Sequence, residues 1–324
     1  MPAITSPLTA TGSVGTPFTY TVTASHGLTF GATGLPAGLV IDSATGVISG
    51  TPTESGTFGV TMSATNTFLS SGSAFISLAI ANTATGTNVT VAPSVPAGTG
   101  PVALTFSSVL VAGDTTVTVT DPAGGPAPPT GFTLGDPPVY YDISTTASFA
   151  GQATICFNYG SINFGGGTPR LFHYQGGAWV DITTSLDTGT STICGSTSSF
   201  SPFAIFVSSI TRAGFYAPVS PVSGYLNTVK GGSTVPLKFN VYVKGVEKTD
   251  TSGLQFSVAS VGCTGGVEDA VDFVTTGETT LRYDASAHQF VQNWKTPSVA
   301  GSCYVVRMIT TADGGSLSAV FKTK

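Results

Sequence analysis

Apolar and polar residues alternate along several segments within the first 83 positions of the chain. Three such segments carry apolar side chains at Phe18, Tyr20 and Val22, at Phe58, Val60, Met62 and Ala64, and at Ala74, Ile76, Leu78 and Ile80. A period of two predicts strands with one buried face. Turn residues separate the segments and no helical period is present, so we expect a β-sandwich.

Residues 34–52 largely dictate their own backbone path. The segment places four glycines and two prolines around two short apolar runs. Residues 39–41 and 47–48 are predicted to be extended. Between them, Asp42 to Gly46 should form an Asx-type turn that ends in a residue free to adopt positive φ.

This segment carries a family resemblance. Together with Gly15-Thr-Pro-Phe-Thr-Tyr20, Gly56-Thr-Phe58 and Ala64-Thr-Asn66, residues 34–52 resemble the signature of immunoglobulin-like modules of the cadherin-like, dystroglycan-type group. Such modules occur in tandem on large bacterial surface proteins. The resemblance implies that residues 1–83 form an immunoglobulin-like sandwich. Only Asp42 and Glu54 are acidic here, which weakens any inference of calcium binding from related domains.

A second module is expected at residues 84–210, after a polar connector at 83–87 that is too short for free reorientation. Residues 152–159 should form a strand and residues 170–182 a hairpin, whereas the Pro- and Gly-rich residues 121–130 should form a surface loop. The segments around Tyr141, Trp179 and Cys194 are similar to a recurrent β module of secreted bacterial multidomain proteins. That family has no settled activity to transfer.

Residues 211–324 are predicted to form the third module. Its long strand should bury Val235, Leu237, Phe239, Val241 and Val243 and expose Lys238, Asn240 and Tyr242. Pro236-Leu-Lys-Phe239, the preceding Val-Lys-Gly-Gly, Trp294-Lys-Thr296 and a cysteine pair resemble the PxKF family. The resemblance implies an extracellular immunoglobulin-like sandwich without an assigned reaction. The fold class is therefore all-β, with three tandem sandwich domains forming a semi-rigid rod.

The four cysteines fall into two pairs, Cys156 with Cys194 and Cys263 with Cys303, each inside one expected module. Neither pair has the close spacing of a zinc or redox site. Two disulfides would each stabilise the fold by about 4 kcal/mol in the chain-entropy model and would place the chain outside a reducing compartment. Buried free thiols are the alternative.

Charged residues make up only 8% of the chain, against about 25% in ordinary domains. Residues 1–210 carry one base and eight acids, and residues 211–324 carry ten bases and eight acids. The clustered basic residues of a nucleic-acid interface are absent. Because the first 169 residues lack Lys and Arg to protect strand edges, we hypothesise that other copies or neighbouring modules cover those edges.

Catalytic patterns are missing from the sequence. The chain has three histidines, His26, His173 and His288, one in each expected module, and no Gly-x-Ser-x-Gly, phosphate-loop or dinucleotide motif. We therefore expect neither an enzyme nor a cofactor. The densest acidic cluster, Glu268, Asp269 and Asp272, is a candidate for calcium binding, and a solvated loop paired with Lys or Arg is the alternative.

Exposed aromatic side chains could bind glycans or another ligand. The candidates are Tyr140, Tyr141, Trp179 and Trp294. Packing in the core or across strands is the alternative for each of them.

No stretch is long and apolar enough to span a membrane, and the first residues lack the basic start and apolar middle of a secretion signal. We therefore expect a mature or excised piece of an exported bacterial protein. The predicted function is non-enzymatic: a spacer or a self-associating subunit of a filament or coat on the cell surface, interacting with itself or with neighbouring modules. Glycan or ligand binding is the alternative.

Overall fold

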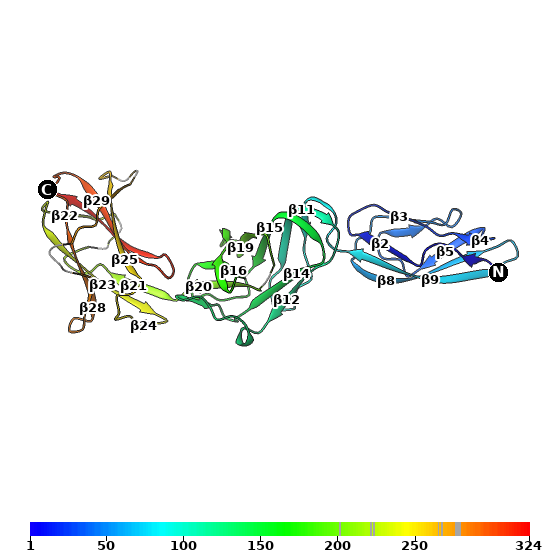
Figure 1. Cartoon of the computed structure of the whole chain (residues 1–324), viewed down its shortest axis with the longest axis horizontal. Helices are drawn as coiled ribbons and strands as arrows, with labels where there is room; N and C mark the ends of the chain where they lie inside the picture. Colours follow the sequence, from blue (N-terminus) through cyan, green and yellow to red (C-terminus); the bar gives the residue numbers. More distant parts are fainter. Residues whose placement is uncertain (201, 221, 223, 265, 267, 276–279) are drawn as a thin grey trace. The chain divides into compact units, whose positions relative to one another are not determined.

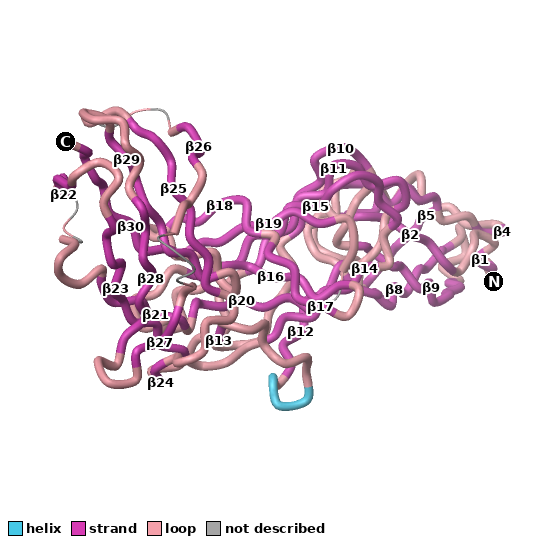
Figure 2. Tube along the Cα trace, turned by 60° about the vertical axis from the view of Figure 1, so that its left-hand side comes forward, coloured by secondary structure: helices cyan, strands magenta, loops and turns pink. Residues whose placement is uncertain are grey.

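The computed structural model describes residues 1–200, 202–220, 222, 224–264, 266, 268–275 and 280–324. Every regular element in these ranges is a strand, apart from one turn of 3₁₀ helix, Pro122–Gly124 (η1), which is the cyan segment of Figure 2. The predicted all-β fold class is confirmed. Among the described residues, no helix has the length and apolar character that crossing a membrane requires.

The chain divides into two compact units. One contains residues 1–127 and 134–206, and the other contains residues 128–133 and 207–324. Apolar side chains gather in three cores, the first two in the N-terminal unit and the third in the C-terminal unit. The short segment 128–133 therefore groups with strands that follow it by more than 70 residues, as the Ser209 amide shows by donating to the Gly131 carbonyl at 2.8 Å.

The first core lies between a four-stranded and a three-stranded sheet (Figure 1). Its strands are β1 Ala3–Ile4, β2 Thr9–Ser13, β3 Phe18–Thr21, β4 Ala24–Ser25, β5 Thr29–Thr33, β6 Leu39–Ile41, β7 Val47–Gly50, β8 Gly56–Thr65 and β9 Ser71–Ala81. The sheet orders are β2-β9-β8-β5 and β3-β7-β6, and β1 pairs with β4. The alternating side chains Val60, Met62, Ile76, Leu78 and Ile80 are buried, as their period predicts.

Residues 34–52 form the β6–β7 hairpin. The Asp42 carboxylate accepts hydrogen bonds from the amides of Ala44 and Thr45 at 2.8 and 3.1 Å, and these bonds lower the pKa of Asp42. Gly46 follows with φ at 74° and donates to the Asp42 carbonyl at 2.8 Å. The predicted Asx-type turn and both flanking strands are confirmed.

The second core lies between sheets of order β10-β11-β15-β19-β18 and β12-β14-β20-β16-β17. The strands are β10 Gly86–Val91, β11 Val102–Val111, β12 Thr115–Thr120, β13 Phe132–Leu134, β14 Tyr140–Thr145, β15 Ser148–Asn158, β16 Pro169–Gln175, β17 Ala178–Asp181, β18 Thr183–Asp187, β19 Thr192–Thr197 and β20 Pro202–Ser208. The predicted hairpin is β16–β17. Its turn residues, Gly176 and Gly177, both have positive φ, as a two-residue type I′ turn requires.

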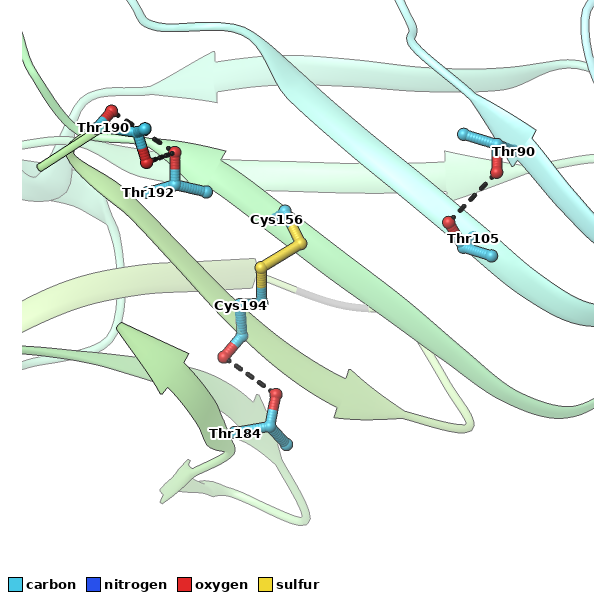
Figure 3. The surroundings of a disulfide bond; sticks show 7 residues. All are labelled: Thr90, Thr105, Cys156, Thr184, Thr190, Thr192 and Cys194. Carbon is cyan, nitrogen blue, oxygen red and sulfur yellow. Dashed lines mark hydrogen bonds between the residues drawn. A yellow bond between two sulfur atoms is a disulfide. The ribbon is translucent and has the colours of Figure 1, made fainter. Parts of the chain in front are cut away.

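The structure contains both disulfides. Cys156 and Cys194 lie directly opposite each other on the neighbouring strands β15 and β19, with 4.1 Å between their Cα atoms (Figure 3). Antibody domains instead use a disulfide that joins their two sheets. Cys263 follows β25 and bonds to Cys303 at the start of β29, the strand that pairs with β25. Each bond therefore reinforces one existing strand pair.

The third core lies between sheets of order β21-β23-β28-β27 and β22-β30-β29-β25-β26. The strands are β21 Ile210–Gly214, β22 Leu226–Val229, β23 Thr234–Val243, β24 Val246–Glu247, β25 Leu254–Val261, β26 Asp269–Val271, β27 Arg282–Asp284, β28 Gln289–Lys295, β29 Cys303–Thr310 and β30 Ser316–Thr323. Val235, Leu237, Phe239 and Val241 are buried, and Val243 is half-buried.

Asn240 corrects the inward–outward prediction for β23. The side chain is buried although its neighbours in sequence, Phe239 and Val241, fill the core. The side-chain nitrogen of Asn240, Nδ2, donates to Glu247 Oε1 at 2.6 Å and to the His288 carbonyl at 2.7 Å. Residues from β24 and from the turn before β28 therefore cover the outer face of the sheet at Asn240. The alternation of apolar and polar residues within β23 cannot predict this burial, because the covering residues lie elsewhere in the sequence.

A buried ion pair ties β21 to the β29–β30 turn. The guanidinium of Arg212 donates to Asp313 Oδ1, and the two side chains are only 13% and 3% exposed. Burial alone would raise the pKa of Asp313, but hydrogen bonds from Arg212, Ser208, Thr310 and the Gly315 amide together lower it. Asp313 therefore remains ionised and satisfied, as a buried charge must.

We predict that Asp313→Ala lowers the free energy of unfolding of the intact chain by about 3–5 kcal/mol, because it leaves Arg212 buried without its counter-charge. Arg170→Ala is the control: its pair with Asp181 is exposed and should contribute at most about 1 kcal/mol. Urea unfolding measures both. A cost for Asp313→Ala no larger than that for Arg170→Ala contradicts the assignment.

Candidate interaction surfaces

Two of the four aromatic candidates lie inside cores. Tyr141 is 1% exposed and packs against Phe157, with ring centroids 4.6 Å apart, and burial raises its pKa to about 12. Trp294 is fully buried and packs against Phe321 at 4.9 Å. A glycan platform must present a ring face to solvent, so the prediction of ligand binding by these two residues is wrong.

Tyr140 and Trp179 instead hold the Pro-rich loop. Their rings lie 5.3 Å apart, and both pack against Phe206. The Tyr140 hydroxyl donates to the Pro126 carbonyl, and Trp179 Nε1 donates to the Ala127 carbonyl at 2.9 Å. Tyr140 is only 1% exposed and Trp179 is half-buried, so this pair anchors residues 126–127 to the outer face of the sheet and offers no open stacking surface.

The three residues of the predicted calcium candidate, Glu268, Asp269 and Asp272, are all exposed, and Glu268 is paired with a base. Glu268 accepts a hydrogen bond from Arg307 at 2.6 Å, which lowers the pKa of Glu268. Asp269 lies exposed on β26, opposite Ser260. Within the described ranges, no group of three or more His, Cys, Asp or Glu side chains could hold a metal ion.

The three histidines lie in different surroundings. His26 and His288 are exposed, whereas His173 is fully buried on β16. Its ring stacks on Phe203 with centroids 4.4 Å apart, and its Nδ1 lies 3.2 Å from the Thr197 hydroxyl. Burial lowers the pKa of His173 and favours the neutral ring, which suits a core residue.

A tight turn between β8 and β9 exposes two large apolar side chains. Asn66 Oδ1 accepts from the amides of Phe68 and Ser70 at 3.0 and 3.1 Å and so fixes the turn. Phe68 and Leu69 are 86% and 85% exposed, and Leu69 has φ at 55°, a left-handed conformation unusual for leucine. Leu28, 56% exposed, precedes β5 beside β8, and its amide donates to the Thr65 carbonyl at 2.9 Å.

Exposed apolar clusters of this kind are typical of interaction surfaces. Alternation analysis missed the cluster because the turn lies between two predicted strands. The adjacent Phe and Leu in a segment that must turn were the available signal.

A pocket of about 220 Å³ lies in the C-terminal unit. Its apolar lining includes Ile210, Val241, Val243 and Leu254. Lys248 and Ser252 also line it, and Lys248 Nζ is held by Asp250 Oδ1 at 2.6 Å. The pocket is smaller than the roughly 300–1,000 Å³ typical of drug-sized ligands, so it fits a small apolar group beside a cation that already has a partner.

We predict that Trp179→Ala frees the Pro-rich loop and increases protease cleavage within residues 121–130, because it removes both the ring packing and the Nε1–H donor. Trp179→Phe keeps a ring and loses only the hydrogen bond, so cleavage should be intermediate. Limited proteolysis with mass spectrometry locates the cuts. Equal cleavage of the native chain and Trp179→Ala contradicts the anchoring role.

We predict that the protonation of His173 contributes to the pH dependence of the free energy of unfolding. Because its folded pKa is depressed, the unfolded chain takes up this proton first, near pH 6.5. Stability from the neutral ring is present above that pH and is lost as pH falls through the folded pKa, by at most about 1.4 kcal/mol per pH unit.

Thermal melts between pH 7 and 5 test this expectation. His173→Gln should remove the contribution of His173 to the pH dependence of stability. The exposed control His288→Gln should retain that contribution. An unchanged dependence in His173→Gln contradicts the assignment.

Comparison with known proteins found no match among curated proteins. Among solved structures, a putative α-galactosidase from Bacteroides fragilis is 34% identical over 24% of this chain and 17% of its own length, with a TM-score of 0.23. A second α-galactosidase/melibiase structure from the same species is covered over 19% of its length. This chain thus spans less than a fifth of either protein.

Longer matches have lower identity. Cadherin domains 3–6 of protocadherin γB2 are 12% identical over 100% of this chain and 72% of theirs, with a TM-score of 0.25. A Bacteroides ovatus protein of a mixed-linkage glucan utilization locus, solved with a heptasaccharide, is 12% identical over 100% of this chain and 70% of its own, with a TM-score of 0.23. Residues 1–81 match the family model described as "Putative Ig domain".

Proposed function

We propose that the chain is a non-enzymatic structural part of an exported bacterial surface protein, serving as a spacer and as a self-associating subunit. The observation that carries the spacer role is the connection at Asn82 and Thr83. Backbone and side-chain bonds attach these two residues to the following module. A connector of this kind limits the motion of the modules that it joins.

Thr83 is fully buried in the connection. Its amide and carbonyl pair with the carbonyl and amide of Gly113 at 2.9 and 3.0 Å. Its hydroxyl lies 2.7 Å from that of Thr115, which is also fully buried. The Thr83 end of the connector is therefore fixed to the edge of the second module, which leaves little free chain between the two modules.

Asn82 makes a second set of bonds. Its side-chain oxygen accepts from the Thr115 amide at 2.8 Å, and its side-chain nitrogen donates to the Thr115 carbonyl at 2.7 Å. Its own amide donates to Asp114 Oδ1 at 3.0 Å. The amide and side chain of Asn82 and the backbone and hydroxyl of Thr83 all have partners, which supports a joint of restricted flexibility.

Other features support the wider proposal. Two disulfides suit an exported protein, and the sparse charge leaves surfaces that other modules can cover without charge burial. The exposed Phe68–Leu69 turn suits an adhesive contact. We propose modules at residues 1–83, 84–210 and 211–324, the last related to the PxKF family.

We predict that Asn82→Ala widens the distribution of distances between the first two modules, because it removes the paired amide bonds to Thr115. Spin labels on cysteines introduced at the exposed positions Thr61 and Ser185 report that distribution, since the native cysteines are in disulfides. Double electron–electron resonance measures its width.

Thr85→Ala, at an exposed connector position, is the matched control and should keep the native width. A native distribution as wide as that of Asn82→Ala contradicts the spacer role.

Ligand binding is the second candidate function, and the pocket beside Lys248 now supports it in place of the buried aromatic side chains. A glycan array with the intact chain tests this alternative. Binding that is lost on Lys248→Ala favours it, and an array without binding argues against a glycan ligand.

A further inference from the structure

Strand β12 ends its sheet and presents unpaired backbone groups along one edge. It pairs with β14 on its other side. Thr146 donates to the Asp114 carbonyl at 2.9 Å, so the even-numbered residues of this strand bond toward β14. The backbone groups of Thr115, Val117 and Val119 therefore point outward, because successive residues of a strand bond on opposite sides.

The outward groups of Thr115 already have a partner. The Asn82 side-chain amide bonds to both its N–H and its C=O, in the manner of a peptide group on an added strand. Among the residues that the structure describes, none bonds to the outward groups of Val117 and Val119. Two donors and two acceptors thus remain beyond the position that Asn82 fills.

This edge also lacks the usual protection. Its sequence is Thr-Thr-Val-Thr-Val-Thr, without charge, proline or glycine. By contrast, β10 contains Asn88 in the left-handed region, with φ at 52°, and β17 ends at the charged Asp181. Edges without such features are templates for an added strand.

We propose that β12 pairs with β12 of a second copy of this chain, antiparallel and centred on Thr118. In this register Val117 of each copy faces Val119 of the other, and four backbone hydrogen bonds form. All the free outward groups on both copies are used. The next pair would place Asp121 against Thr115, where Asn82 already occupies the edge, so the contact ends there.

The strand's own side chains favour a second copy as the occupant. Thr116, Thr118 and Thr120 are exposed on one face, and in this register Thr118 faces Thr118 while Thr116 faces Thr120. Threonine pairs across strands are favourable, and no charge is opposed by a like charge. The arrangement has two-fold symmetry, which closes at a dimer.

The pairing deepens the proposed function and rests on its self-association. Four hydrogen bonds form a small contact, weak between isolated chains. Chains anchored side by side would meet at high effective concentration, where weak contacts accumulate.

Sedimentation velocity of the intact chain at concentrations up to about 1 mM tests the pairing. Thr118→Lys and Thr118→Glu should each weaken dimerisation at least tenfold, since the two-fold axis brings the introduced charge against itself. An equimolar mixture of the two variants should restore dimers, because lysine then faces glutamate. Loss of packing or folding predicts no such rescue.

Thr184→Lys is the matched control. Thr184 is also an exposed edge-strand threonine whose hydroxyl donates to a neighbouring strand's carbonyl, that of Cys194 at 3.2 Å (Figure 3), as Thr118 does to Asp142. This variant should dimerise like the native chain. In the native chain, hydrogen exchange of the Val117 and Val119 amides should slow as concentration rises.

Three results overturn the pairing. Association that Thr118→Lys leaves intact assigns self-association to another surface. A mixture of the two variants that fails to restore dimers excludes the register in which Thr118 faces Thr118. Both results leave the proposed function standing. A chain that stays monomeric up to about 1 mM overturns the pairing and the self-associating role together, while the spacer role is decided separately by the Asn82 measurement.

Discussion

Hydrogen bonding between backbone groups of neighbouring strands is the interaction on which every level of this structure depends. A strand at the end of a sheet leaves alternate N–H and C=O groups without a strand partner, and each needs water or another polar group. Charged side chains usually protect such edges, but they are scarce here. Neutral side chains satisfy some of these backbone groups. Asn82 bonds to the edge at Thr115, and the Thr183 hydroxyl accepts from the Leu171 amide of β16 at 2.8 Å, just beyond the last residue pair of β16 and β17.

Strand positions could be predicted from the sequence because one-sided burial leaves a period of two. The β8 and β9 alternation, the Asx turn after β6 and the Gly176-Gly177 hairpin all follow from residues close together in the chain. Local chemistry determines these elements, so a single sequence contains the required information. The cysteine pairing could also be inferred, because only two pairs lie within separate modules.

Features that depend on segments far apart in the sequence could not be predicted from local patterns. Alternation shows which residues share a face, but it does not show what covers that face. Tyr140 is buried because the Pro-rich loop folds over it, and Asn240 because Glu247 and His288 cover it. Likewise, the grouping of residues 128–133 with the C-terminal unit depends on contacts across more than 70 residues. Of the aromatic residues predicted to bind a ligand, Tyr140 and Trp179 therefore anchor the Pro-rich loop, and Tyr141 and Trp294 lie in cores.

The disulfides have a mechanical consequence for the chain when it is under tension. When force pulls on the two ends, the bond between Cys156 and Cys194 carries the load around the 38-residue loop. Even if the second core ruptures, that loop cannot extend, which shortens the released length by about 130 Å at 3.5 Å per residue. The bond between Cys263 and Cys303 acts in the same way on a 40-residue loop. Residues 156–194 and 263–303 thus cannot be extended by force, and tension there passes through covalent bonds where the strands could otherwise separate.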